Sequence, residues 1–363
     1  MRLLDRYVAR LFLQAFVGAL VVFSLSAVAL DFFARLSHFS NYAQRAEGTF
    51  AAEYSGIEIV LGFYAAYLPY LIKEVLPFVT VAAGLFTLSV MLRDNEVMPA
   101  LAAGTSARRL LLPVFLCGAL IGVGHLLFQE LAIPSLNRKH IALKRLFSGD
   151  RTDLIEYLPH LRDGAGTVVR AGSYRFSDQS LRDVVIQRPW EGDSFPTWLA
   201  PLLLPDGDAW TAPEGALVRP AAPDAPPTQL PAGTRVKFGV SPSEVEALVS
   251  KQGTQEIATR ELRRLARKFP ERRFLEVALH KQVARPFTSL VLLLLGVPVV
   301  LAVGRSLFLG GGVAFFLSAT YYFMDLFFTS LGDRGDLPPE MASYAPLLLF
   351  ASLGAASLAT VPT

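Results

Sequence analysis

Six apolar runs alternate with polar segments along the chain, and each is close to the length of a membrane-crossing helix. A helix rising 1.5 Å per residue needs about 20 apolar residues to cross a hydrocarbon core of ~30 Å. Because lipid offers no hydrogen-bond partner to open backbone groups, such runs predict helices. The predicted spans cover residues 11–33, 72–92, 109–131, 281–303, 307–328 and 343–361.

The second span is preceded by a further apolar stretch, residues 55–71. The two together are too long for one crossing and are interrupted by Pro69 and Pro77. Tyrosines gather in this stretch, as they do at membrane interfaces. We therefore expect an interfacial helix that leads into the span, with a kink near Pro77.

The polar segment between the third and fourth runs predicts an inserted all-β domain. Its short apolar and β-branched runs are separated by Gly, Pro and Asp turns, which is typical of antiparallel strands in a sandwich or barrel. The stretch Pro201–Pro231, rich in Pro, Ala and Asp, is expected to form a surface loop. The clearest predicted strands are Thr167–Ala171, Asp183–Arg188, Ala216–Arg219 and Thr234–Phe238.

Two helices are expected after these strands. Ser241 is a suitable N-cap, with Pro242 at the first helical position and Glu244 at the third. A second, charged helix, Thr254–Lys268, leads back to the membrane.

Basic residues in the short loops set the expected orientation of the spans. They gather at the N-terminus and in the loops after spans two and four, whereas the opposite short loops are less basic. Both termini are therefore predicted to be cytoplasmic and the β domain periplasmic. The first run is long for the core of a cleaved signal peptide, so we expect it to remain as a span. The basic residues are Arg2, Arg6, Arg10, Arg93, Arg108, Arg109 and Arg305.

The predicted organisation has three parts. Residues 1–134 hold the first three transmembrane helices and a cytoplasmic helix at 93–104. Residues 135–270 form the periplasmic β domain, and residues 271–363 hold the last three transmembrane helices. The expected fold class is a membrane α-helical bundle of six transmembrane helices with a large inserted β domain.

Composition narrows the function classes. Hydrophobic residues make up 52% of the chain, above the ~45–50% of soluble domains, which agrees with a membrane protein. The net charge of +3 is small and no basic block carries interleaved aromatic residues, so we expect no nucleic-acid binding. The single cysteine, Cys117, lies in an apolar run and is expected to act as a small hydrophobe.

Catalytic and metal-binding patterns are not evident in the sequence. The chain has no Gly-Lys dipeptide and hence no Gly-x-x-x-x-Gly-Lys-[Ser/Thr] phosphate loop. Glu276 and His280 are four residues apart on a predicted helix, which indicates a helical contact rather than a metal site. No nucleophile-elbow pattern is present. The chain is expected to be a non-enzymatic protein without a cofactor of its own.

The short loop after span two predicts a small cytoplasmic helix. Asp94 or Asn95 is an acceptable N-cap, and Gly104 suits the C-terminal end. Such a helix would present Glu96 near its start to a cytoplasmic partner.

This loop, residues 93–106 (RDNEVMPALAAGTS), resembles the coupling-helix signature of the lipopolysaccharide export permeases, the LptF/LptG (YjgP/YjgQ) family. The similarity covers essentially the whole chain in the same order: three spans, an outer β domain and three spans. The N-terminal block that begins at Leu4 resembles the G subunit more than the F subunit. Further matching blocks are Leu4-Asp5-Arg6-Tyr7, His280 to Pro286, Gly296-Val297-Pro298, Tyr321-Tyr322 and Leu337-Pro338-Pro339 to Pro346.

The resemblance implies one permease half of an ABC exporter in the bacterial inner membrane. Its implied partners are a second LptF/LptG-type permease, a cytoplasmic ABC ATPase dimer that binds the ATP, and a periplasmic bridge protein of β-jellyroll fold. The substrate would be lipopolysaccharide, and the chain's own β domain would be jellyroll-like.

The resemblance also assigns roles within the loop. In the family the coupling helix docks into a groove of the ATPase, where its acidic residue pairs with a cation. That role falls to Glu96, in a segment that includes Arg93, Asn95 and Gly104. The alternative is that Glu96 only complements the helix dipole. Pro99 departs from the usual helix former, which predicts a kinked or late-starting helix.

Four charged residues are predicted near the outer edge of the membrane. Lys73 lies 20 residues before Arg93, and Asp325 lies 20 residues after Arg305, which places each ~30 Å from the inner face. Asp31 and Arg35 end the first span on the same side. The cations among them suit the phosphates of lipid A. Equally, Asp31 and Arg35 have the spacing of a helical ion pair, and Lys73 has a stem long enough to snorkel.

Two other functions remain open from the sequence. One is a permease half for another amphiphilic lipid, without a bridge partner. The other is a non-transporting membrane scaffold whose β domain binds periplasmic proteins. Six spans disfavour the scaffold, because a simple anchor needs one.

Overall fold

The computed structural model describes residues 3–34, 36, 56–132, 154–156, 158, 160–162, 166–175, 178–188, 196–220, 226–249, 254, 257–303 and 306–359. The chain divides into two compact units. The first unit comprises residues 1–34, 64–135 and 276–363 and holds the long helices, and the second comprises residues 35–63 and 136–275 and holds the strands.

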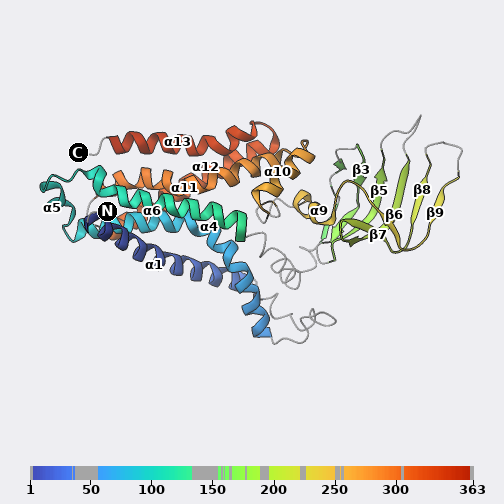
Figure 1. Ribbon diagram of the computed structural model, residues 1–363, viewed down its shortest axis with the longest axis horizontal. Helices are drawn as coiled ribbons and strands as arrows, with labels where there is room; N and C mark the ends of the chain where they lie inside the picture. The colour runs from blue at the N-terminus through green and yellow to red at the C-terminus, as the bar shows by residue number, and fades with distance from the viewer. Residues whose placement is uncertain are drawn as a thin grey trace. The chain divides into compact units, whose positions relative to one another are not determined.

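The described part of the chain contains six helices long and apolar enough to cross a membrane, which confirms the predicted spans. Figure 1 shows these helices side by side as a bundle. A π-helical turn, η2 (Phe128–Ala132), extends the third of them. The six are α1 (Leu3–Ala34), α4 (Gly56–Arg93), α6 (Ala107–Leu127), α11 (Arg273–Val303), α12 (Leu307–Arg334) and α13 (Pro339–Ala359).

Helix α4 joins the predicted interfacial helix and the second span in one helix, and the interfacial position of residues 56–71 stays a prediction. It continues without interruption from Gly56 to Arg93, with Pro69 and Pro77 inside it. Its 38 residues span about 57 Å, so α4 is longer than one membrane crossing requires. Prolines are tolerated in membrane helices because neighbouring helices and local adjustments satisfy the freed backbone groups.

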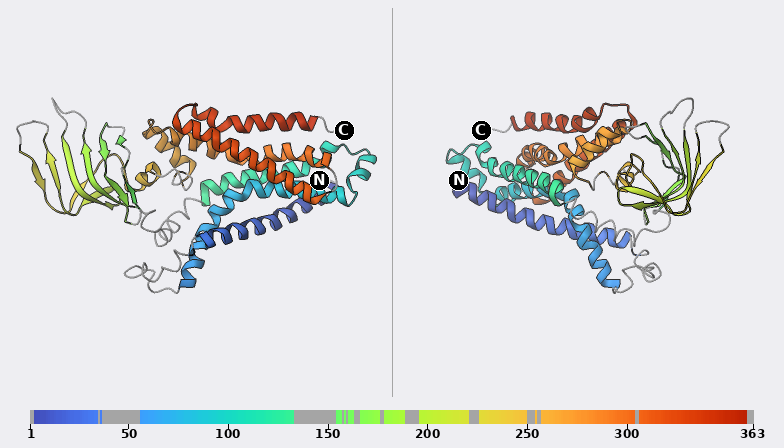
Figure 2. Two further views of the ribbon diagram at one scale, coloured as in Figure 1. Left: turned by 180° about the vertical axis from the view of Figure 1, so that it is seen from behind. Right: turned by 45° about the vertical axis from the view of Figure 1, so that its right-hand side comes forward.

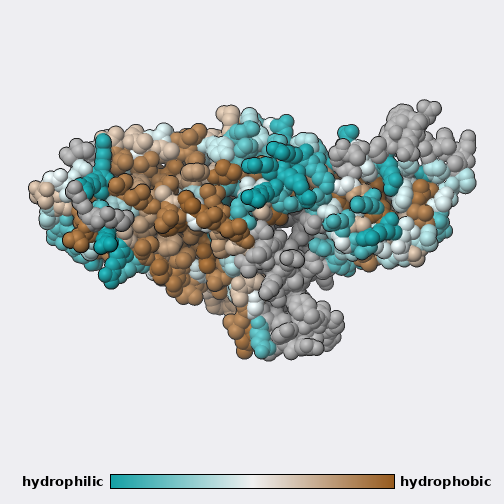
Figure 3. All heavy atoms as spheres, viewed as in Figure 1, coloured by the Kyte–Doolittle hydropathy of each residue, from teal (hydrophilic) through white to brown (hydrophobic). Residues whose placement is uncertain are grey.

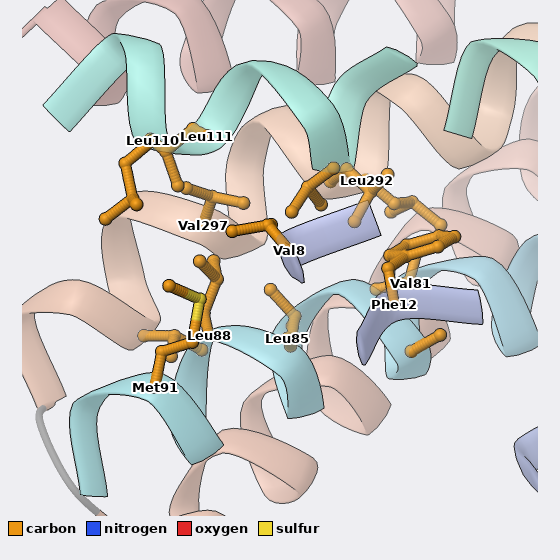
Figure 4. Packing of buried hydrophobic residues seen from close by; sticks show 14 of the residues in the cluster. Val8, Phe12, Val81, Leu85, Leu88, Met91, Leu110, Leu111, Leu292 and Val297 are labelled. Atoms are coloured by element: carbon orange, nitrogen blue, oxygen red, sulfur yellow. The ribbon is translucent and has the colours of Figure 1, made fainter. Parts of the chain in front are cut away.

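The core of the bundle joins α1, α4, α6 and α11 (Figure 4). Phe12 of α1 is fully buried beside Val81 of α4, and both belong to the same cluster. The outward face of the bundle that Figure 3 shows is apolar as well, with hydrophobic surface over these helices. An apolar exterior of this kind suits contact with lipid. The fully buried members of the cluster are Val8, Phe12, Val81, Ala83, Leu88, Met91, Val114, Leu292, Leu293 and Val297.

Two glycines let helices approach closely. A Cβ atom on Gly122 of α6 would lie 2.8 Å from the backbone oxygen of Pro286 in α11. A Cβ atom on Gly354 of α13 would lie 3.0 Å from the backbone nitrogen of Leu295. Small residues at such crossings are typical of membrane helix packing.

The second unit contains a ten-stranded antiparallel sheet, which confirms the predicted inserted β domain. Figure 2 shows the strands curving round in one sheet. The main path runs β1-β4-β5-β6-β7-β10; β2 pairs with β3, which pairs with β5, and β9 pairs with β8, which pairs with β6. The strands are β1 (Leu154–Glu156), β2 (Leu161–Arg162), β3 (Val168–Arg170), β4 (Ser173–Arg175), β5 (Ser180–Gln187), β6 (Thr197–Asp206), β7 (Ala209–Ala212), β8 (Ala216–Arg219), β9 (Thr228–Leu230) and β10 (Thr234–Val236).

The predicted surface loop Pro201–Pro231 is wrong, because most of β6 and all of β7, β8 and β9 lie within it. Pro201 stands opposite Asp183, at the one position where the β5–β6 pairing is interrupted. On its other edge β6 leaves β8 after Leu199 and joins β7 from Leu204, so Pro201 again lacks a strand partner. A residue without an N–H therefore disrupts no ladder bond there.

Two helices follow the strands, α9 (Pro242–Val249) and α10 (Thr259–Lys268). The predicted start of α9 is confirmed: the Ser241 backbone nitrogen donates to Glu244 Oε2 at 2.9 Å, as in a capping box. The indole Nε1 of Trp210 in β7 donates to the Val240 backbone oxygen at 2.9 Å, which ties the start of α9 to the sheet. Helix α10 begins five residues later than predicted.

The close approach at Gly122 generates a test of the bundle's packing. Gly122→Ala is expected to lower the melting temperature in detergent, because overpacking against a backbone atom costs about 1–3 kcal/mol. Gly124→Ala on the same helix is the matched control, since a Cβ atom there meets nothing within 4 Å. Equal melting temperatures for the two variants would contradict the packing described here.

Candidate functional site

The first candidate site is the short helix α5 (Val97–Ala102) between α4 and α6. Asn95 adopts a left-handed conformation with φ +59°, and the Glu96 nitrogen donates to the Met91 oxygen at 2.9 Å. The Asn95 nitrogen donates to the Leu92 oxygen at 3.3 Å. These two bonds form a Schellman motif that ends α4. Asn95 is therefore the residue that terminates the preceding helix, not the predicted N-cap of the next one.

Helix α5 ends at Gly104 as predicted, through a second Schellman motif. Gly104 has φ +79°, its nitrogen donates to the Leu101 oxygen at 2.9 Å, and the Thr105 nitrogen donates to the Ala100 oxygen at 3.1 Å. Pro99 is the third residue of α5 and lies in its first turn, where a missing N–H is tolerated. The helix starts late, at Val97, rather than at Asp94 or Asn95.

Glu96 lies at the start of α5 and contacts the N-terminal helix. Its Oε1 accepts a hydrogen bond from the Tyr7 hydroxyl of α1 at 2.7 Å. Its Oε2 is enclosed and has no hydrogen-bond partner among the described residues. Val97, the next residue, is 5% exposed within the bundle core, whereas Met98 is 68% exposed. Helix α5 is thus anchored to α1 and the core on one side and open on the other.

The second candidate site is a charged layer of the helix bundle, on the far side of the core from α5, in which Lys73 is buried and Glu74 is exposed. Arg285 Nη1 of α11 donates to Glu74 Oε1 of α4 at 2.7 Å. Lys73 Nζ lies 3.8 Å from the same oxygen and the lysine is 3% exposed. Two cations therefore share one carboxylate, and Lys73 does not snorkel to the surface.

One helical turn before Arg285, a second ion pair joins α11 to α12. Lys281 Nζ donates to Asp325 Oδ2 and to Thr329 Oγ1, each at 2.7 Å. Both charged side chains are mostly buried, with 21% and 17% exposed. In an apolar medium an isolated charge is costly, so each side chain stabilises the other.

The other charged residues that the sequence predicted have fewer described contacts. Asp31 Oδ2 accepts a hydrogen bond from the Tyr64 hydroxyl of α4 at 3.1 Å. Arg35 lies outside the described residues, so its contacts and its pairing with Asp31 stay predictions. Arg93 pairs with Asp94 at 3.0 Å, and both side chains are about half exposed.

Sequence reasoning missed Glu74, Lys281 and Arg285. The same depth count would have found the two cations, because the predicted fourth span begins at Lys281, at the outer edge, and Arg285 follows one turn later. Their i,i+4 spacing puts them on one face of α11. Glu74 carried no signal of its own beyond its place next to Lys73.

No group of three or more His, Cys, Asp or Glu side chains among the described residues is arranged to hold a metal ion. His280 does not pair with Glu276: its ring lies 3.4 Å from the Tyr344 hydroxyl and 3.8 Å from a Glu340 oxygen.

Comparison with known proteins gives one finding for the whole chain. The model of a family described as "Lipopolysaccharide export system permease LptF/LptG" matches residues 6–360. No curated protein matches the chain with significant similarity. The matched region includes α5, the β strands and all six candidate spans, apart from the first three residues of α1.

The ion pair between α11 and α12 generates a double-mutant prediction. Lys281→Gln and Asp325→Asn are each expected to lower the melting temperature, because a charged hydrogen bond contributes about 1.5–3 kcal/mol. The double variant is expected to be no less stable than the worse single variant. Asp336→Asn, in an exposed loop, is the control. Fully additive effects of the two substitutions would contradict a stabilising pair.

Proposed function

Because this chain belongs to the lipopolysaccharide export system permease family LptF/LptG, we propose that it forms one permease half of an ABC exporter that passes lipopolysaccharide towards a periplasmic bridge. Membership makes the chain a multi-pass subunit of an inner-membrane transport complex, not an enzyme. The observation that carries the proposal is the family match across residues 6–360, together with the six spans and the inserted sheet.

The proposed orientation places α5 in the cytoplasm and the β domain in the periplasm. The basic loops flank α5: Arg93 ends α4, and Arg108 and Arg109 lie in the first turn of α6. The arginines of the N-terminal segment lie near the same end, since Tyr7 contacts Glu96. Positive residues concentrate on the cytoplasmic side of membrane proteins.

We assign α5 as the contact with a separate ATPase subunit that binds and hydrolyses ATP. Its open side, with Met98 exposed, is available to a partner, while Val97 holds the helix to the bundle core. Glu96 would exchange its neutral donor, Tyr7, for a cation of the ATPase. A cation in place of the Tyr7 hydroxyl would add the attraction between two opposite charges to the hydrogen bond, which favours that exchange.

A second permease half would cover α1 and α12. Only 11% of the residues in the most apolar stretch of α1, and 12% in that of α12, are buried, against 61% for α4 and α11. Large apolar side chains project from both helices. Two such halves facing each other would enclose an apolar space for acyl chains. The projecting side chains are Val17, Val21, Val22, Leu25, Phe315, Phe316, Phe323, Leu326 and Phe327.

The charged layer is the proposed contact for lipid phosphates. Among the described residues, Lys73 and Arg285 both lie against Glu74, and Lys281 pairs with Asp325. Three cations gathered on neighbouring helices suit the charge-assisted binding of a phosphate. Arg35 and Asp31 belong to the same proposed site by their position at the end of the first span.

The β domain would receive the lipid and hand it on. Among the described strands, β9 and β10 each have a single strand partner, and so do β1 and β2. Strands of this kind are where another β protein adds its own strand. A bridge protein of β fold is the proposed partner.

The proposal is tested by purifying the chain in mild detergent from native membranes and identifying every co-purifying protein and lipid. A small ATPase, a second six-span permease and lipopolysaccharide are expected. Glu96→Arg is expected to lose the ATPase, because the substitution reverses the charge at the docking helix. Asp336→Arg makes the same charge change in an exposed loop outside α5 and is expected to keep all partners.

Other outcomes distinguish the alternatives. A chain that purifies alone or with periplasmic proteins only would contradict the exporter proposal and favour a scaffold. An ATPase lost in Glu96→Arg, together with a different amphiphile in place of lipopolysaccharide, would assign the chain to export of that lipid.

A further inference from the structure

Helix α10 carries a concentrated basic face for which the proposed transport steps provide no role. Its ten residues include five basic ones, and its buried residues Leu262, Leu265 and Ala266 lie on one side. At 100° per residue, Arg260, Arg263, Arg264 and Arg267 fall on the opposite side within an arc of about 100°. All four are exposed, and Figure 3 shows hydrophilic surface over α10.

Most of this face is free of internal partners. Arg260, Arg263 and Arg267 form no ion pair within the described part of the chain, whereas Arg264 pairs with Glu261 at 2.5 Å. Three exposed guanidinium groups within a helix about 15 Å long form a patch of positive charge. If no partner covered this patch, the like charges of its arginines would repel one another at a small cost in free energy.

The face is held rigidly on the second unit. Glu244 of α9 is 3% exposed and accepts hydrogen bonds from Lys268 Nζ at 2.7 and 2.9 Å and from Arg264 at 3.4 Å. Since the start of α9 is fixed to the sheet through Trp210, α10 and its arginines move with the β domain. The exposed arginines thus form a preorganised surface, not a loose tail.

The chain itself keeps this face close to the membrane. Only residues 269–272 separate the end of α10 from the start of α11, the fourth candidate span. Five Cα–Cα steps reach at most about 19 Å. Helix α10 is therefore tethered within about 19 Å of Arg273, which precedes the predicted start of the fourth span at Lys281 by eight residues, or about 12 Å of helix.

We propose that the Arg260, Arg263 and Arg267 face of α10 binds the phosphate groups of anionic phospholipids at the membrane surface and so docks the β domain onto the bilayer. Charge complementarity and the short link to α11 select this occupant: the nearest extended anionic surface is the lipid headgroup layer. Each Arg close to such a surface raises the binding constant about fivefold. This attraction falls off within a Debye length. The proposal needs the membrane span but neither the ATPase nor lipopolysaccharide.

The test measures how close α10 lies to the headgroups. The full chain carries a fluorophore at Ala258→Cys, the N-cap of α10 at its end away from α11, in a Cys117→Ser background and is placed in nanodiscs with a quencher attached to the lipid headgroups. Quenching is expected to be stronger with phosphatidylglycerol than with phosphatidylcholine alone, and this excess is expected to disappear at high salt. The triple variant Arg260→Gln, Arg263→Gln, Arg267→Gln is expected to lose the excess quenching.

Two matched variants separate the face from general charge and from folding. Arg170→Gln, Arg182→Gln, Arg219→Gln removes the same charge from exposed strand positions of the same unit and is expected to keep the excess. Changing the three α10 arginines to Lys is expected to restore it. Both α10 variants leave the Glu244 contacts with Lys268 and Arg264 unaltered.

The proposal is overturned if quenching is independent of phosphatidylglycerol, or if the strand-position variant loses the excess as fully as the α10 variant. Quenching that responds to lipopolysaccharide but not to phosphatidylglycerol would also overturn it, and would assign the face to the transported lipid. Because no ATPase or export step is measured, failure here is distinct from failure of the proposed transport function.

Discussion

Hydrocarbon offers neither hydrogen bonds nor charge solvation, and this constraint underlies the helical unit of the protein. It requires that the spanning segments be helical, and even Pro69 and Pro77 lie inside α4. It also requires that charges within the bundle find partners. Arg285 with Glu74, and Lys281 with Asp325, meet that requirement and tie α11 to α4 and α12. The same two contacts gather cations at one level of the bundle, which is the proposed site for a phosphate.

The two ends of the bundle are specialised in different ways. At one end, paired Schellman motifs around Asn95 and Gly104 force the chain to leave α4, form α5 and re-enter as α6 within a few residues. A helix held that tightly, and bonded to α1 through Tyr7 and Glu96, moves with the bundle. Force applied to α5 would therefore reach α1 directly. Helix α1, with little of its apolar surface buried, is one of the two proposed contacts with a second half.

The sequence predicted what periodicity and length determine. Apolar run length located all six spans, and alternation with turn residues located four of the strands, because both signals act locally along the chain. These local signals do not predict long-range packing. Pro201 and its neighbours indicated a loop, yet the strand tolerates Pro201 because its partners on both edges are interrupted there. Asn95 was assigned as a helix start, although its left-handed backbone makes it a helix end.

The candidate site was predicted only in part for the same reason. Counting residues from a basic loop placed Lys73 and Asp325 at the outer edge, but a count along one helix cannot identify the partner on another. The pairing of Arg285 with Glu74 and of Lys281 with Asp325 became evident only through their distances. The role of Glu96 still rests on family resemblance, while its bond to Tyr7 is a finding of the structure.

The central claim is that lipopolysaccharide occupies the apolar space beside the charged layer. A photo-crosslinking side chain at Leu326, which is 69% exposed and follows Asp325, tests it in the complex purified from native membranes. Leu112 of α6, 53% exposed and close to the α5 end of its helix, is the reference position. The account predicts a lipopolysaccharide adduct at Leu326 that is much stronger than at Leu112. Equal adducts at both positions, or phospholipid adducts alone, would contradict it.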